Sequence, residues 1–250
     1  MTTSAQVRRS RREQMELQRL AEARKERRNR IVFVGLGVLV LIIVIAIFVY
    51  GYVSASKSGG SETPPNANSG QNGILLAPAT KGVPVLDVFT DYNCPHCMSA
   101  DLTLNAVLKQ AADQGYATVV MHTMSFEASS SRPAAIAASC ADFVGKFFEY
   151  NNQLFRNQSQ NGYDTRMLTV TVPDAAGIYR EDLTTFQTCV DKQSTAKFVD
   201  NMQTYASKQK VTTTPTFLLD GKDVTMQLYN NTSGTYDPDL LRQVLKMTGQ

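Results

Sequence analysis

The sequence has few of the side chains that bind metal ions. It contains only two histidines, His96 and His122, and four cysteines. A closed zinc site needs a second pair of Cys or His ligands at a spacing like that of Cys94 and Cys97. His96 lies inside that first pair, and His122 is a lone polar residue in an apolar strand, where a core or edge position is expected. We therefore predict no metal site and no bound cofactor.

Charge is absent from a long stretch near the N-terminus. The 23 residues from Ile31 to Val53 include no Asp, Glu, Lys or Arg. At about 1.5 Å per residue, a helix of this length crosses a hydrocarbon core of about 30 Å. Cleavable signals have a short basic start and an apolar core of about 7 to 15 residues, whereas 30 residues precede this longer run. Residues 31–53 are therefore predicted to be a retained transmembrane signal-anchor.

The basic residues are concentrated just before this run. Residues 1–30 contain ten Lys/Arg and four Glu, a net charge of +6, and the whole chain is +3, so the remainder is −3. A basic excess beside an apolar run orients a membrane helix with its basic side in the cytoplasm. We expect a cytoplasmic tail over residues 1–30, no nucleic-acid partner, and an extracytoplasmic position for everything after Val53.

Residues 54–73 contain almost nothing apolar and are rich in Ser, Gly, Asn and Pro. This composition is typical of a flexible linker. We therefore expect a tether over residues 54–73 and a folded domain over residues 74–250.

The pattern of apolar residues in the domain predicts an α/β fold with an all-helical insertion. The segment VPVLDVFT is typical of a buried strand, and a helical spacing follows it as far as Gly115. The turn Asp220-Gly221 between two strand-like runs indicates a β-hairpin. The expected elements are, in order, a strand at 83–90, a helix to 115, a strand at 116–124, a helical block at about 128–208, a hairpin at 214–229 and a closing helix at 237–247.

All four cysteines lie after the apolar run, where disulfides persist. Cys140 and Cys189 both fall in the helical block, and a bond between them would close a loop of about 50 residues. A cysteine on an apolar helical face is otherwise a small buried hydrophobe. Their compartment favours a structural disulfide between Cys140 and Cys189.

The pair in Cys94-Pro95-His96-Cys97 has three interpretations: half of a zinc site, a small structural disulfide, or a redox centre. Cys94 falls where a strand ends and a helix begins, so free backbone N–H groups and the helix dipole favour a thiolate there. Pro95 suits the first helical turn because its missing N–H loses nothing. His96 adds a donor that favours the thiolate further. Cys97, one turn into the helix, is expected to be the more buried, resolving thiol.

The stretch DYNCPHC, residues 91–97, followed by TTTPTFLLDG, residues 212–221, resembles the DsbA branch of the thioredoxin superfamily. It looks most like the membrane-anchored thiol-disulfide oxidoreductases of actinobacteria. The resemblance implies a thioredoxin fold with an inserted helical domain and a catalytic pair at Cys94 and Cys97. It also implies a cis-proline at Pro215, preceded by Thr214, whose backbone pairs with an extended substrate. An ordinary trans turn is the alternative for Thr214-Pro215-Thr216.

Two positions depart from the family pattern. Many relatives have a buried acid six residues before the first cysteine, where this chain has Val88. Asp87 is adjacent, but strand alternation turns it to the opposite face, so no proton relay is assigned. Relatives often have Gly two residues before the cis-proline, where this chain has Thr213.

The resemblance implies an enzyme that introduces disulfide bonds into exported proteins, with attack on an exposed Cys94 sulfur. The implied partners are reduced exported proteins and a membrane quinone-linked reoxidase of the DsbB or vitamin-K-epoxide-reductase type. A membrane-anchored monomer is expected. A disulfide reductase or isomerase is one alternative, and a substrate-binding holdase on a thioredoxin scaffold is another.

Overall fold

The computed structural model describes residues 41–43, 45 and 60–247. Residues 41–43 and 45 are helical. The rest of the expected signal-anchor over 31–53, the basic tail and residues 54–59 lie outside the described residues. Among the residues that are described, we find no helix that is both long and apolar enough for a membrane span. Residues 60–247 belong to one compact unit, which holds all four cysteines.

A five-stranded mixed sheet forms the centre of this unit, in the order β1-β3-β2-β4-β5. The central strands β2 and β3 are parallel, and every other neighbouring pair is antiparallel. In β2 all residues after Val85 are buried, which agrees with the expectation of a strand covered on both faces. The strands are β1 (Ile74–Leu75), β2 (Val85–Thr90), β3 (Thr118–Thr123), β4 (Thr216–Leu219) and β5 (Lys222–Asp223).

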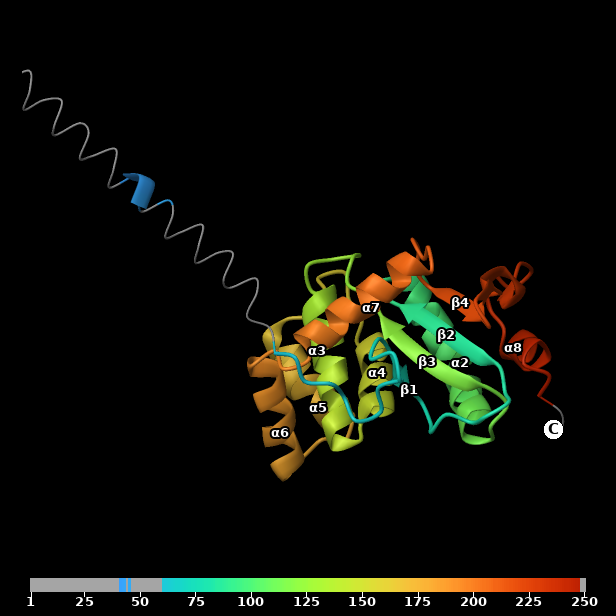
Figure 1. Ribbon diagram of the computed structural model, residues 1–250, viewed down its shortest axis with the longest axis horizontal. Coiled ribbons are helices and arrows are strands. Elements are labelled where there is room, and N and C mark those ends of the chain that lie inside the picture. Colours follow the sequence, from blue (N-terminus) through green and yellow to red (C-terminus); the bar gives the residue numbers. More distant parts are fainter. Residues whose placement is uncertain (1–40, 44, 46–59, 248–250) are drawn as a thin grey trace, which may run out of the picture. The chain divides into compact units, whose positions relative to one another are not determined.

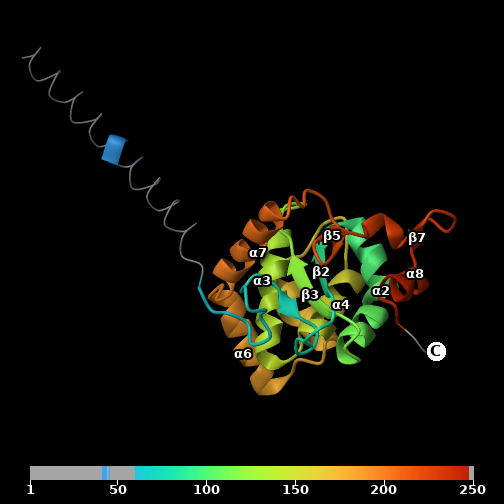
Figure 2. The ribbon, with the colours of Figure 1, turned by 45° about the vertical axis from the view of Figure 1, so that its right-hand side comes forward.

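Helices cover both faces of the sheet. Helix α2 (Pro95–Asp113) connects β2 to β3, and α8 (Pro238–Val244) packs beside it. Helix α7 (Ala196–Lys208) packs against β3 from the other side, as Figure 2 shows. Because β2 enters α2 directly, the end of this central strand and the first turn of α2 form one corner of the fold.

The segment between β3 and β4 is almost entirely helical, as expected for the insertion. The block is divided after the short helix η1, because Gly145 takes a left-handed conformation (φ 65°) and ends this helix. In Figure 1 α3, α4, α5 and α6 gather on one side of the sheet. Besides α7, the insertion contains α3 (Ser131–Ala141), η1 (Asp142–Val144), α4 (Phe147–Arg156), the π-helix η2 (Met167–Thr171), α5 (Val172–Ala175) and α6 (Arg180–Asp191).

Residues 60–73 differ from the flexible linker expected over 54–73. The backbone N–H groups of Gly60 and Glu62 donate to the carbonyls of Gln193 and Ser194 at 2.9 and 2.8 Å. We call residues 60–73 the strap, because they run across the insertion to the sheet; it is the teal segment before β1 in Figure 1.

The strap is held by polar contacts with distant residues, which its composition does not indicate. Asn66 donates through its backbone N–H and its Nδ2 to the two carboxylate oxygens of buried Asp142, at 2.7 and 2.8 Å. A Cβ on Gly73 would lie 2.5 Å from Val120 and 2.7 Å from the His122 ring, so the strap passes directly over β3. The folded domain therefore begins by residue 60, and its polar residues fold because buried acceptors bind them.

The C-terminal part contains a shorter hairpin than expected. Asp220 and Gly221 form the predicted turn with φ angles of 49° and 77°, but β5 has only two residues. The Asp223 carboxylate accepts the Thr225 N–H at 2.8 Å, which turns the chain into the helix η3 (Thr225–Gln227). A small sheet of β6 (Tyr229–Asn230) and β7 (Thr235–Tyr236) leads to α8, which begins at Pro238 within the expected closing helix.

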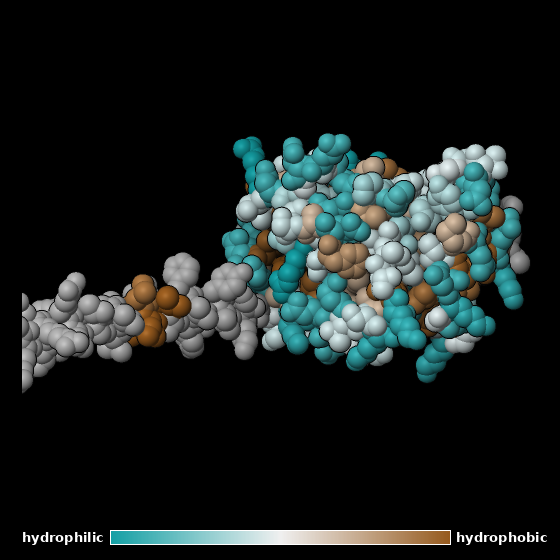
Figure 3. Space-filling view, turned by 90° about the horizontal axis from the view of Figure 1, so that it is seen from above, coloured by the Kyte–Doolittle hydropathy of each residue, from teal (hydrophilic) through white to brown (hydrophobic). Residues whose placement is uncertain are grey.

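The expectation for His122 is confirmed. Its side chain is buried in β3, with Nδ1 2.6 Å from the Asn72 carbonyl and Nε2 2.8 Å from Asp87 Oδ1. Stacking against Phe89 and Tyr205 encloses the ring. On the outside, the face of the domain in Figure 3 is mainly hydrophilic, with scattered apolar side chains.

Candidate active site

The two cysteines of the CPHC motif lie at the corner between β2 and α2. Cys94 is the N-cap of α2 in an extended conformation, and its Sγ accepts the Cys97 N–H at 3.3 Å. Pro95 is the first helical residue, and Pro95 and His96 are both exposed. Because a cap residue satisfies free N–H groups at the helix start, the sulfur of Cys94 takes the role that Ser or Asp has at other helices.

Both sulfur-bearing residues are buried, with 3% of Cys94 and 1% of Cys97 exposed. This differs from the exposed Cys94 sulfur that we expected. The Cys94 thiol turns inward, where it donates to the Thr214 carbonyl at 3.3 Å. The backbone N–H of Asp91, just after the end of β2, donates to the Cys97 sulfur at 3.4 Å.

The two thiols differ strongly in acidity. The pKa of Cys94 is lowered from 9.0 to about 6, chiefly by hydrogen bonding with the Cys97 side chain and also by Thr214 and the Cys97 N–H, against the opposing effect of burial. Burial raises the pKa of Cys97 far above its ordinary value, and its hydrogen bond to Cys94 raises it further. At neutral pH the reduced pair thus holds a thiolate on Cys94 and a thiol on Cys97. The tuning role of His96 stays a prediction.

Thr214 and Pro215 lie opposite the motif, and the peptide bond between them is cis. The Thr214 side chain is largely buried, and its hydroxyl has no partner of good geometry within residues 60–247. It nevertheless lowers the pKa of both thiols, because an O–H dipole stabilises a neighbouring thiolate. Thr214 therefore contributes both a carbonyl and a hydroxyl to the site.

Asp91 is a site residue to which the sequence interpretation gave no role. Its fully buried carboxylate accepts the N–H groups of Asn93 at 2.9 Å, Phe126 at 3.1 Å and Glu127 at 3.2 Å, and the Ser131 hydroxyl at 2.7 Å. The carboxylate therefore ties the loop before Cys94 to the loop after β3 and to α3. Its position directly before the motif was the only signal in the sequence.

The insertion also holds the backbone of the motif. Gln158 Nε2 donates to the carbonyls of Tyr92 and Cys94 at 2.6 and 3.0 Å. The Tyr163 hydroxyl donates to the Tyr92 carbonyl at 3.0 Å. These residues follow the motif by more than 60 positions, so no local pattern indicated them.

Tyr236 is a further neighbour that the sequence did not reveal. This buried residue of β7 has its pKa raised to about 12, first by burial and then by the charges of Cys97 and Cys94. Helix α2 packs against β7, where Ser99 Oγ lies 3.2 Å from Thr235 Oγ1. The pair of strands β6 and β7 thus lies beside the site on the side of Cys97.

The acid nearest to the missing relay position belongs to the other face of the sheet. Val88 is buried in β2, and Asp87 bonds to His122 and accepts the Tyr205 hydroxyl at 3.5 Å on the face that α7 covers. Asp101, one turn after Cys97, is a second buried acid, and burial raises its pKa to about 6. Its carboxylate accepts Asn151 Nδ2 at 2.8 Å, so it faces the insertion.

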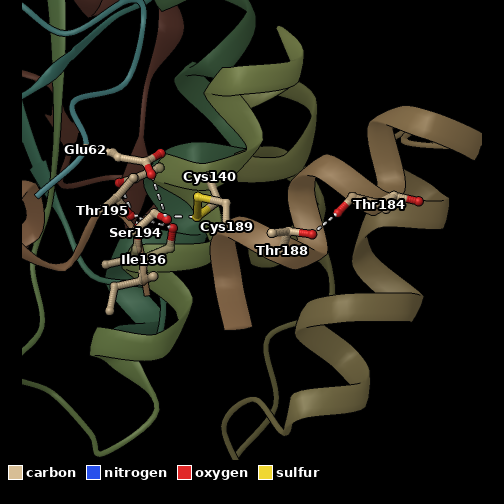
Figure 4. Close-up of a disulfide and its surroundings, with 10 residues drawn as sticks. Glu62, Ile136, Cys140, Thr184, Thr188, Cys189, Ser194 and Thr195 are labelled. Carbon is tan, nitrogen blue, oxygen red and sulfur yellow. Dashed lines mark hydrogen bonds between the residues drawn. A yellow bond between two sulfur atoms is a disulfide. The ribbon is translucent and has the colours of Figure 1, made fainter. Parts of the chain in front are cut away.

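Cys140 and Cys189 form a disulfide that joins α3 to α6 (Figure 4). Cys140 is fully buried and Cys189 is 7% exposed. Beside the bond, the Thr195 hydroxyl donates to the Ile136 carbonyl at 3.2 Å. The disulfide belongs to the interior of the insertion and is separate from the CPHC pair. Within the described part of the chain, no group of three or more His, Cys, Asp or Glu side chains could hold a metal ion.

Comparison with known proteins bears on this arrangement. Residues 79–236 match the family described as Thioredoxin. No curated protein matches the chain.

Several solved structures share the fold. The MdbA protein from Actinomyces oris, a thiol-disulfide oxidoreductase, matches with a TM-score of 0.62 and 16% identity over 77% of this chain and 95% of that one. The MdbA protein from Corynebacterium diphtheriae, also a thiol-disulfide oxidoreductase, matches with a TM-score of 0.56 and 19% identity over 68% and 92%. BdbD from Bacillus subtilis matches with a TM-score of 0.53 and 20% identity over 76% and 97%. The resemblance to DsbA-type proteins is confirmed at the level of the fold. The family match over residues 79–236 covers more than half of the chain, so the chain belongs to the thioredoxin family.

Proposed function

We propose that this protein is a thiol-disulfide oxidoreductase that transfers a disulfide between Cys94 and Cys97 to cysteine pairs of exported proteins. The observation that carries the proposal is the separation of the two thiol pKa values, one lowered to about 6 and the other raised. A stable Cys94 thiolate favours the reduced form of the pair, so the oxidised pair gives up its disulfide readily.

The reaction has two exchange steps. A substrate thiolate attacks Cys94 Sγ, the bond between Cys94 and Cys97 breaks, and Cys97 leaves and takes up a proton, as its raised pKa favours. A second substrate thiolate then attacks the substrate sulfur in the mixed disulfide, and Cys94 leaves as a thiolate. Two electrons pass from the substrate to the enzyme. Thr214, whose carbonyl lies 3.3 Å from Cys94 Sγ, serves as the docking point for the substrate backbone, with Pro215 shaping the same loop.

The proposed setting is the outer face of a membrane. The uncharged run at 31–53 and the +6 tail before it support an anchor with its N-terminus in the cytoplasm. The disulfide between Cys140 and Cys189 also fits an oxidising compartment. Turnover then requires an electron acceptor, for which a quinone-linked membrane reoxidase of the DsbB or vitamin-K-epoxide-reductase type is proposed.

Two other functions make different demands on the same residues. A disulfide reductase uses the same chemistry in the opposite direction and needs a low reduction potential, close to that of thioredoxin. A holdase would use the surface around Cys94 and leave the thiols without a role.

The test uses a reduced model protein with two cysteines, mixed with the oxidised enzyme. The wild type is expected to oxidise it, and Cys94→Ser to abolish the transfer. In the reverse direction, reduced Cys97→Ser is mixed with the disulfide form of the same model protein: the Cys94 thiolate attacks that disulfide, one substrate sulfur leaves as a thiolate, and the mixed disulfide on Cys94 is expected to accumulate because no Cys97 thiol is present to release it. Unchanged oxidation by Cys94→Ser would exclude the proposed chemistry. A reduction potential near that of thioredoxin would reassign the direction.

A further inference from the structure

A cavity of about 640 Å³ opens beside the first turn of α2. Three segments surround it: the start of α2, the loop that follows β3 and the loop that follows α4. Its volume is within the range of about 300 to 1,000 Å³ that is typical of ligand sites. The role proposed above for the cysteines does not use this cavity.

Polar groups make up a large part of the cavity lining. The loops contribute hydroxyl, amide and backbone groups, chiefly from residues 127–130 and 158–163. Glu127 is the one charged side chain among the residues that line it, all of which lie in the described part of the chain. The buried Asp91 carboxylate holds the Glu127 backbone N–H at 3.2 Å and adds a second negative charge behind the loop. The cavity therefore carries acceptors and negative charge, with no basic residue in its lining.

The cavity adjoins the reacting sulfur. Asn93 and Pro95, the two neighbours of Cys94 in the chain, both line it. Gln158 lines it too and donates to the Cys94 carbonyl at 3.0 Å. The charge of Glu127 opposes the lowering of the Cys94 pKa, which places its carboxylate within electrostatic reach of the thiol.

Resting on the proposed function, we propose that this cavity is a subsite for a basic side chain, Lys or Arg, close in sequence to the substrate cysteine that attacks Cys94. A substrate held at Thr214 and joined to Cys94 meets the cavity at Asn93 and Pro95, the two neighbours of Cys94 in the chain. There the Glu127 carboxylate pairs with the cation, and the surrounding carbonyl and hydroxyl oxygens accept its N–H groups. An acidic side chain at the same position meets like charge and is disfavoured.

The bound cation also assists the second exchange step. In that step the bond between the substrate sulfur and Cys94 breaks, a new bond forms between the two substrate sulfurs, and Cys94 leaves as a thiolate. A cation beside Glu127 offsets the negative charge that opposes this thiolate. Substrates with a basic neighbour are therefore favoured both in binding and in release of Cys94.

The experiment measures oxidation of three reduced two-cysteine peptides by the full-length oxidised protein. The peptides are identical except that Lys, Gln or Glu flanks the attacking cysteine. We expect the second-order rate constant for this single exchange to fall in the order Lys, Gln, Glu, with a Lys-to-Gln ratio of about two to five, the range of an exposed ion pair. The ratio is expected to shrink at high salt, since an exposed pair is screened.

Glu127→Gln is expected to reduce the Lys-to-Gln ratio to about one and to lower the pKa of the Cys94 thiol. The matched control is Glu149→Gln, which removes the same charge from an exposed residue of α4. Glu149 lines a different cavity, together with Lys109. This control is expected to keep the wild-type ratio. A wild-type ratio of one, or a ratio that survives Glu127→Gln, would overturn the subsite.

Failure of the subsite and failure of the proposed function have different signatures. If the wild type oxidises all three peptides at equal rates, the cavity has no preference and the disulfide exchange stands. If it oxidises none of them and forms no mixed disulfide through Cys94, the proposed function itself is wrong. The measured Cys94 pKa adds a readout that a structural role of Glu127 would not move.

Discussion

At the scale of single residues, the site is built around one asymmetric pair of thiols. Cys94 accepts hydrogen bonds at the start of a helix, while Cys97 is enclosed by β2, Thr214 and Tyr236. Burial raises the pKa of Cys97 and keeps it protonated, and its hydrogen bond to Cys94 raises that pKa further. In the proposed exchange the pair therefore has a fixed order of reaction, with Cys94 forming the bond to the substrate and Cys97 acting as the leaving thiol.

This asymmetry predicts a pH dependence of stability in the reduced protein. The pKa of Cys94 is lowered from 9.0 to about 6 in the folded state, so the unfolded chain binds the proton more tightly. Ionisation of Cys94 therefore adds nothing to the free energy of unfolding below about pH 6. Between about pH 6 and pH 9 it adds about 1.4 kcal/mol per pH unit, and this gain is lost over the same interval as the pH falls. Above pH 9 the raised pKa of Cys97 opposes further gain.

Urea unfolding of the reduced protein between pH 5 and pH 9, with Cys140 and Cys189 kept oxidised, measures this dependence. Cys94→Ser is the reference, because all other titrating groups are common to both proteins. The free energy of unfolding of the wild type should rise relative to Cys94→Ser between these limits, and the ultraviolet absorbance of the thiolate should appear with a midpoint near pH 6. Parallel stability curves would contradict the pKa assigned to Cys94.

At the scale of elements, the sequence predicted what local patterns encode. The strand before the motif, the proline at the start of α2 and the turn at Asp220-Gly221 follow from apolar runs and residue conformation. The early end of β5 did not, because it depends on the Asp223 carboxylate binding Thr225. Likewise Cys94 and Cys97 were visible in the motif, whereas Gln158 and Tyr236 reach the site only through the tertiary fold.

The disulfide between α3 and α6 is expected to act on stability alone. It closes a loop of 49 residues, which corresponds to about 4 kcal/mol in the chain-entropy treatment. Replacing both Cys140 and Cys189 with Ala should lower the free energy of unfolding by about this amount. Peptide oxidation, measured where both proteins are folded, should change by less than about twofold, because the bond lies outside the CPHC site.

Denaturant unfolding and peptide oxidation on the same samples separate the two effects. Thr188→Ala, on the exposed side of α6 near the bond, controls for a general weakening of that helix. A double variant as stable as the wild type, or one whose Cys94 pKa has moved, would show that the disulfide has another role.

At the scale of the whole molecule, the strap changes where the domain begins. Its composition resembles a linker, yet Asn66 satisfies a carboxylate 76 residues away and Asn72 satisfies His122. A polar segment can fold when it pairs with buried groups elsewhere, and the sequence of that segment alone does not record the partners. Residues 60–73 therefore belong to the folded domain and not to a tether.

The strap should be required for full stability of the domain. A chain that begins at residue 60 keeps its contacts, whereas one that begins at residue 74 leaves the Asp142 carboxylate without Asn66 and His122 Nδ1 without the Asn72 carbonyl. Each buried group left unpaired costs about 1 to 3 kcal/mol, so the shorter chain should lose about 2 to 6 kcal/mol in the free energy of unfolding.

Asn66→Ala in the full-length protein should lose a part of this free energy. It removes the Nδ2 bond to Asp142 at 2.8 Å and keeps the backbone N–H bond at 2.7 Å. Asn68→Ala is the matched control, since the Asn68 side chain bonds only within the strap, to Asn72. Equal stability of the chains that begin at residues 60 and 74 would show that the strap rests on the domain without stabilising it, and would restore residues 60–73 to the linker.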